Sequence, residues 1–282
     1  MKFNKKLILK TIFTILFLIF LFYFVKPNQI IQALKQAKFI WILLAFLLLP
    51  LNLFIQFLRW KFLVVLSNEN VPNREIIKSI LYSFSYSIFT PARLGEIGRA
   101  FHIQNSKKDE LVILAFFEKF FAFGSLLLFG FLSLGIFKTY LFFIIVILII
   151  FILVESKTIV KFIPFIQRYK RVIRRVKISK IFSISIIFVF IYIFQFFLVL
   201  NAFHIVQFFK SFFMISIVMF FNSLPITLSG LGIRELLSVY FFKDLGISPA
   251  SAASASLIIF FINILIPTFV GFGLHIFGKK NV

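Results

Sequence analysis

Long apolar runs separated by short charged segments dominate this sequence. A helix needs about 20 mainly apolar residues to cross a bilayer, and suitable runs lie at 7–25, 39–58, 111–136, 140–154, 181–206, 209–228 and 249–277. Two further stretches, 76–104 and 229–246, are apolar only in part and are interrupted by proline, glycine and charge. The pattern predicts an all-α, polytopic membrane bundle of about seven to eight spans, with two broken segments that either span or re-enter.

The composition supports a membrane rather than a soluble fold. Of the 282 residues, 61% are apolar and only 14% are charged, whereas soluble domains are about 45–50% apolar. Lipid must therefore be the solvent for most of the chain. We expect a single integral membrane domain over 1–282, with an N-terminal half at 7–154, a basic connector at 155–180 and a C-terminal half at 181–277.

The charge balance indicates which class of partner the chain binds. There are 31 Lys and Arg residues against nine Asp and Glu, a formal net charge of +22, and the basic residues lie mostly beside the apolar runs. This placement favours a membrane face with anionic lipids over nucleic acid. Cysteine is absent, which excludes disulfides and thiol chemistry, and we expect no cofactor.

The basic segments predict the orientation of the chain in a bacterial cell membrane. The N-terminal lysines before a long apolar run indicate a retained signal anchor with a cytoplasmic N-terminus, and the 155–180 connector is the strongest cytoplasmic marker. A full crossing at 76–90 would move that connector outside, so 76–104 is expected to form a re-entrant hairpin. The connector has apolar residues at spacings of three and four, which predicts an amphipathic interfacial helix; a solvated basic loop is the alternative.

The two broken segments, 90–99 and 224–235, share one composition. Each follows an apolar run and combines proline, two glycines, arginine and glutamate. Interrupted backbone survives at membrane depth only where protein or water lines the gap. The breaks therefore predict a cavity, and their helix-breaking residues are Pro91, Gly95, Gly98, Pro225, Gly230 and Gly232.

The charged residues of these segments suit an anionic ligand. Arginine offers a planar fork to phosphate, which points to Arg93, Arg99 and Arg234 as substrate-binding residues, while Glu96 and Glu235 would orient them. Paired, Gly/Pro-interrupted segments in two halves are also typical of a transporter binding site. The alternative is that both are interfacial turns whose charges reach to water.

The other polar residues have either two possible roles or no predicted role in binding. Glu118 either forms a neutralised pair with Lys119 or faces the same cavity as Glu96. Arg59 is explained by interface anchoring, and the amides within the spans are expected to bond between helices. They are Gln195, Asn201, Asn222 and Asn263. The histidines, which are His102, His204 and His275, have no partner at ligand spacing, so no metal site is expected.

At these residues the chain resembles the transmembrane region of lysylphosphatidylglycerol synthases, also described as flippase-like membrane proteins. Arg59-Trp60 is similar to the family's Arg-Trp after an early span, and the segment from Pro91 to Glu96 with Arg99 resembles its Pro-x-x-x-Gly-Glu-x-x-Arg. Glu118-Lys119 stands where the family commonly has Glu-Arg. The segment 224–235 is similar to its most recognisable signature.

The sequence also departs from that family. Ala122 stands where an aspartate is frequent, and a basic residue common in the last long span has no counterpart between Leu257 and Ile266. Because the last apolar run ends close to residue 282, we expect the soluble aminoacyl-transferase domain of the full-length synthases to be absent. The resemblance therefore implies the lipid-translocating half without the half that charges lipid with an amino acid.

The leading hypothesis is a lipid translocator rather than an enzyme, with no catalytic residue assigned. An anionic phospholipid or a lipid-linked headgroup would bind at Arg93, Arg99 and Arg234, balanced by the carboxylates Glu96, Glu118 and Glu235. Two alternatives remain open: an intramembrane lipid-modifying enzyme, and a non-catalytic partner of a separate synthase. A homo-oligomer is compatible with each.

Overall fold

The computed structural model describes residues 15, 16, 19, 21, 23, 25–91, 93–104, 106–134 and 169–277. Within them the chain is helical, with no strand and a single isolated β-bridge. Among these described residues, four helical stretches are long and apolar enough to cross a membrane. They are α3 (Phe39–Leu47) with α4 (Leu49–Ser67), α6 (Lys108–Leu134), α11 (Ile178–Phe203), and α14 (Pro249–Phe260) with the π-helical turn η3 (Phe261–Leu265) and α15 (Ile266–Phe277).

These four stretches confirm the predicted spans at 39–58, 111–136, 181–206 and 249–277, with shifted ends. The first is longer than expected, because α4 continues to Ser67. Pro50 lies in the first turn of α4, where the missing N–H has no partner to lose, so the chain bends at Leu48 without leaving the helical path. The run at 140–154 and most of the run at 7–25 lie outside the described residues.

The predicted span at 209–228 is wrong. The helix α12 (Phe208–Asn222) has 15 residues, about 22 Å at 1.5 Å per residue, which is shorter than a hydrocarbon core of about 30 Å. The chain stays apolar after Asn222, but Pro225 and the glycines beyond it stop the helix. The apolar composition alone therefore does not predict that the helix ends at Asn222.

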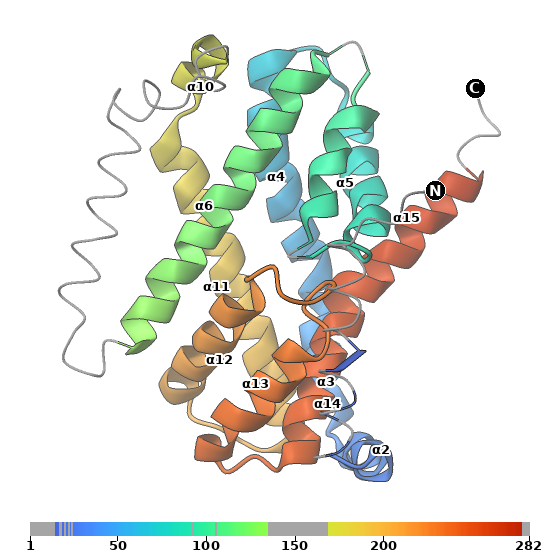
Figure 1. Ribbon diagram of the computed structural model, residues 1–282, viewed down its shortest axis with the longest axis vertical. Helices are drawn as coiled ribbons and strands as arrows, with labels where there is room; N and C mark the ends of the chain where they lie inside the picture. Colours follow the sequence, from blue (N-terminus) through green and yellow to red (C-terminus); the bar gives the residue numbers. More distant parts are fainter. Residues whose placement is uncertain are drawn as a thin grey trace.

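Two short helical hairpins replace full crossings in the broken regions. The first pairs α5 (Asn73–Ser87) with the 3-10 helix η1 (Leu94–His102), and the second pairs α12 with α13 (Ile233–Phe242). In Figure 1 the first hairpin occupies the upper half of the bundle and the second the lower half, so that their tips meet near the middle. The return of 76–104 toward its own side fits the re-entrant hairpin predicted from loop charge.

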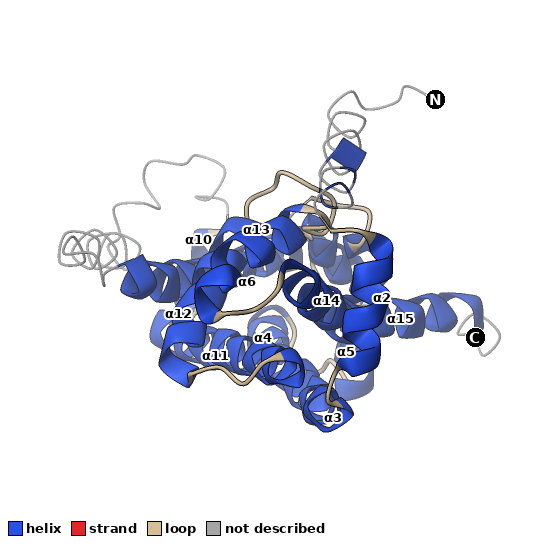
Figure 2. Cartoon of the chain, turned by 90° about the horizontal axis from the view of Figure 1, so that it is seen from below, coloured by secondary structure: helices blue, strands red, loops and turns tan. Residues whose placement is uncertain are grey.

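Short helices and apolar clusters complete the bundle. The helix α2 (Pro27–Gln36) packs on one side of α14 and α13 packs on the other (Figure 2). Of the connector, the structure describes α10 (Lys170–Arg175), where Tyr169, Ile173 and Val176 are buried and Arg174 and Arg175 are exposed. That part has the predicted amphipathic pattern, while the rest of the connector before residue 169 lies outside the described residues.

Candidate functional site

The tip of the first hairpin is a tight turn held by backbone contacts. Arg93 takes the left-handed conformation, with φ of 56°, and Thr90 Oγ1 accepts the Gly95 N–H at 2.7 Å. A Cβ at Gly95 would lie 2.6 Å from the carbonyl carbon and oxygen of Tyr86. Only glycine allows α5 and η1 to approach so closely.

The tip of the second hairpin contains three residues with positive φ within four positions. Ser229, Gly230 and Gly232 have φ values of 49°, 78° and 84°, and a Cβ at Gly230 would overlap the side-chain oxygen of Asn222. Helix α13 then starts with the Gly232 N–H donating to Glu235 Oε2 at 2.7 Å. A carboxylate in the first turn satisfies donors that the helix start leaves open.

The two tips are joined directly. Pro91 and Leu228 form an antiparallel bridge, and the Ser229 N–H donates to the Thr90 carbonyl oxygen at 3.3 Å. The Ser229 hydroxyl also donates to the Ser87 carbonyl oxygen at 3.0 Å. The broken segments therefore meet inside the bundle, and neither is a separate turn at the surface.

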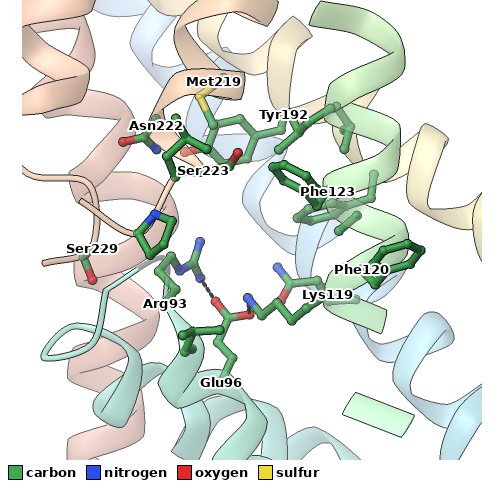
Figure 3. Close-up of a pocket in the computed structure, with 18 of the residues that line it drawn as sticks. Arg93, Glu96, Lys119, Phe120, Phe123, Tyr192, Met219, Asn222, Ser223 and Ser229 are labelled. Atoms are coloured by element: carbon green, nitrogen blue, oxygen red, sulfur yellow. Dashed lines mark hydrogen bonds and ion pairs between the residues drawn. The ribbon is translucent and has the colours of Figure 1, made fainter. Parts of the chain in front are cut away.

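A cavity of about 390 Å³ lies beside the joined tips (Figure 3). Its polar lining is formed by side chains from α4, both tips, α6 and the end of α12. These polar residues are Gln56, Arg59, Arg93, Glu96, Lys119, Asn222, Ser223 and Ser229. The rest of the lining is mainly apolar and includes Phe116, Phe120 and Phe123, which share a face of α6 with Lys119, together with Phe188 and Val189 of α11. A cavity that combines charged and apolar lining suits an amphiphile.

Six charged side chains at the cavity form two linked ion groups. Glu118 binds the Nε of Arg59 at 2.6 Å through one oxygen and Arg99 Nη2 through the other. Glu96 binds Arg93 Nη2 at 2.5 Å and also Lys119 Nζ, as the dashed lines of Figure 3 show. Four basic groups thus face two carboxylates, which leaves a formal excess of two positive charges.

Aromatic rings pack against the guanidinium groups of two arginines, one that lines the cavity and one behind it. The guanidinium carbon of Arg99 lies 4.2 Å from the centroid of the Trp60 ring, and that of Arg59 lies 4.8 Å from the Phe188 ring. The Trp60 indole N–H donates to Ser79 Oγ at 3.1 Å, which fixes the ring. Such cation–π contacts are worth about 2 kcal/mol when desolvated, so they hold the cations rigidly.

The structure divides the predicted site residues into three groups. Arg93 and Glu96 line the cavity, as does the helix-breaking Pro225. Arg99 and Glu118 lie one layer behind it, where the exposed fractions of their side chains are 2% and 1%.

Arg234 and Glu235 lie apart from the cavity lining and are fully buried. Arg234 Nη2 binds Glu235 Oε1 at 2.5 Å, and Ser256 of α14 donates to the same oxygen at 3.0 Å. Arg234 is not among the residues that line the cavity, because the turn at Gly232 directs the start of α13 toward α14. This pair instead fixes the second tip.

Sequence reasoning missed or misread several lining residues. Arg59 is 5% exposed and faces the cavity rather than the interface. Lys119 pairs with Glu96 instead of its neighbour Glu118, since adjacent residues on a helix point in different directions. The signal that could have identified Arg59 is its spacing from Gln56 on α4, which places both on one helical face.

Residues 7–271 match the family described as lysylphosphatidylglycerol synthase TM region. The chain belongs to this family. A comparison with curated proteins found no match.

Ala122, one of the two departures from the family pattern, lines the cavity. The cavity therefore has a larger positive excess than it would have with an aspartate at this position. As a lysylphosphatidylglycerol synthase TM region, the chain is a membrane-embedded protein of a family linked to lipid modification. Among the described residues no three His, Asp or Glu side chains converge as a metal site.

Proposed function

We propose that this protein translocates an anionic phospholipid or lipid-linked substrate across the membrane, with the phosphate of the headgroup bound in the cavity at Arg93 and Lys119. The positive excess in the cavity carries this proposal. Glu118 and Lys119 lie ten and eleven residues after the start of α6, about 15 Å along the helix, which is near mid-depth of a hydrocarbon core of about 30 Å. Uncompensated charge is costly at that depth and favours an anionic ligand.

Arg93 and Lys119 are suited to direct contact with the phosphate. Their side chains are 21% and 25% exposed, whereas Glu96 between them is 9% exposed. Arg93 Nε has no hydrogen-bond partner among the described residues. A phosphate oxygen would satisfy this donor and add a charge-assisted bond worth about 1.5–3 kcal/mol.

The apolar side of the cavity provides for the acyl chains. Phe116 and Phe120 are 59% and 43% exposed on the outer face of α6 and also line the cavity. A lipid can therefore keep its chains against α6 in the bilayer while its headgroup enters between the hairpins.

Loop charge supports a cytoplasmic position for the end of the bundle that carries α10. Arg174, Arg175, Lys107 and Lys108 lie at this end, close to where the first hairpin begins. With that orientation, the first hairpin enters from the cytoplasm and the second from the outside of a bacterial cell membrane, and the N-terminus is cytoplasmic.

Lipid movement in vesicles tests the proposal. The purified protein is reconstituted into phosphatidylcholine vesicles with fluorescent phosphatidylglycerol, and dithionite reports how much label reaches the outer leaflet. We expect Arg93→Ala and Lys119→Ala to lower the rate by about tenfold or more, as loss of a charge-assisted bond predicts. Arg74→Ala, at an exposed position outside the cavity, is the control. Equal rates in protein-free and protein-containing vesicles would refute translocation.

The same preparation separates the two alternatives. A change in lipid mass during the assay would indicate an intramembrane lipid-modifying enzyme. The family description names a synthase, so co-purification of a stoichiometric synthase without lipid movement would indicate a non-catalytic partner.

A further inference from the structure

Three carboxamide side chains meet in the bundle interior, on helices far apart in the sequence. The Asn52 side-chain amide of α4 donates to Gln195 Oε1 of α11 at 2.7 Å and to Asn263 Oδ1 of η3 at 3.3 Å. Asn263 also donates to Gln195 Oε1 at 2.8 Å. All three residues are buried, with exposed fractions of 1%, 0% and 6% for Asn52, Gln195 and Asn263. We call this group the amide triad.

The amide triad adjoins the inner wall of the cavity. Asn52, Gln56 and Arg59 follow at spacings of four and three on α4, so they share one helical face, and Gln56 and Arg59 both line the cavity. The lining also includes Ile264, the residue after Asn263. A polar stripe on α4 thus runs from the charged cluster past Gln56 to the triad.

The triad is not fully satisfied by its own members. Asn52 Oδ1 is buried and has no hydrogen-bond partner among the described residues. A group that served only to hold helices together would be expected to pair all its buried polar atoms. The open acceptor therefore points to a further ligand atom, such as a hydroxyl, an amine or a water.

The backbone at the triad is irregular in a way that supports this reading. Asn263 lies within η3, the π-helical turn between α14 and α15. Single π-helical turns inside α-helices occur frequently at functional sites. Here the turn places a side chain with two donors and an acceptor beside the route from the cavity.

We propose that the amide triad is a second polar site for the headgroup, occupied after the phosphate leaves Arg93 and Lys119 on the way to the opposite end of the bundle. This rests on the proposed translocation. Beyond the triad the path is closed by apolar packing around Val199, Leu200 and Phe212. In this structure the triad itself is buried behind the cavity lining, so the headgroup reaches it only when the side chains around Gln56 move apart.

Cysteine accessibility tests the site without requiring transport. The chain has no cysteine, so Asn52→Cys can be labelled alone with a charged methanethiosulfonate reagent in vesicles. Ser223→Cys in the cavity lining is the accessible reference, and Val199→Cys in the apolar cluster is the buried reference. We expect Asn52→Cys to react faster than Val199→Cys and more slowly than Ser223→Cys, because thiol labelling follows exposure to water and the triad meets water only while it opens toward the cavity. A rate no faster than that of Val199→Cys overturns the proposal.

Lipid movement provides the second measurement. We expect Asn52→Leu to slow movement of fluorescent phosphatidylglycerol by about tenfold or more, and Asn52→Ser, which keeps a polar group, to slow it less. Asn201→Leu is the matched control, since within the described part of the chain that buried amide of α11 bonds to backbone atoms of Phe197 and Val206 and not to another side chain. Wild-type rates in Asn52→Leu overturn the triad's role. Absence of movement in the wild type instead refutes the proposed function, and the labelling result still decides whether the triad is reached from the cavity.

Discussion

Pro91 and Leu228 pair through their backbones in an antiparallel bridge, although they belong to opposite halves of the chain. The bridge joins the two tips that carry Arg93 and Pro225, both of which line the cavity. The contact between the tips is therefore part of the binding site and not only of the fold.

A disulfide can test the contact between the tips. Residues opposite each other in an antiparallel pair have Cα atoms about 4.5–5.5 Å apart, within the range of about 4.4–6.8 Å that a disulfide allows. We expect the double variant Pro91→Cys with Leu228→Cys to crosslink under mild oxidation, as measured by loss of free thiols and by mass spectrometry. Pro91→Cys with Tyr240→Cys, at an exposed position of α13, should keep both thiols. Free thiols in the first pair would contradict the tip arrangement.

Gly95→Ala should destabilise the protein. Its methyl group would lie 2.6 Å from the Tyr86 carbonyl, and overpacking of this kind costs typically about 1–3 kcal/mol. Thermal unfolding in detergent should show a lower Tm, together with slower lipid movement. Gly273→Ala is the control, because a Cβ there meets nothing within 4 Å and alanine favours the helix by about 0.8–1.0 kcal/mol. An unchanged Tm in Gly95→Ala would show that α5 and η1 can separate without loss.

Glu118→Gln should lower the free energy of unfolding more than most single substitutions. The change leaves the guanidinium groups of Arg59 and Arg99 buried beside each other without their shared carboxylate. Removing one partner of a buried ion pair costs about 3–5 kcal/mol. Unfolding titrations in mixed micelles give the value, and Glu69→Gln at an exposed position is the control. A change below about 1 kcal/mol, as for a surface pair, would mean that water reaches Glu118 freely.

Stability should fall on acidification because of His102 at the end of η1. Burial, the neighbouring His275 and the positive charge of Lys108 lower the pKa of His102 below its ordinary value of 6.5. The ring contacts Tyr82 and accepts or donates one hydrogen bond with the Tyr86 hydroxyl at 3.0 Å. The unfolded chain therefore takes up the proton first, so stability is lost as pH falls through about 6.5 and levels off below the lowered pKa.

The measurement is Tm as a function of pH between about 8 and 5, the interval in which an ordinary histidine titrates. His102→Gln should flatten this dependence by a few degrees relative to the wild type. The exposed residue His204, which directly follows α11, serves for comparison. Its replacement should leave the dependence of Tm on pH as it is in the wild type. A His102→Gln variant with the full wild-type dependence would assign the effect to other groups.

The sequence predicts the spanning helices well and the ion pairs poorly. Apolar runs locate α6 and α11 to within a few residues, and proline with glycine locates both tips. Local pattern does not determine which charges meet, because the partners of Glu118 come from α4 and η1. The sequence also did not predict that α12 ends at Asn222. Apolar residues such as Leu224 and Leu228 continue after the helix ends, but they pack inside the protein instead of spanning lipid.

The length of the two hairpins has a consequence for how access can change sides. Each hairpin stops near the middle of the bundle, while α3 with α4, α6, α11 and α14 with α15 continue past the middle (Figure 1). To change the side of the membrane to which the cavity opens, the protein would then need only a hinge at a few turn residues. Gly230 and Gly232 already have conformations that glycine adopts freely. The long helices can then stay in place, and only the two short helical hairpins need to move.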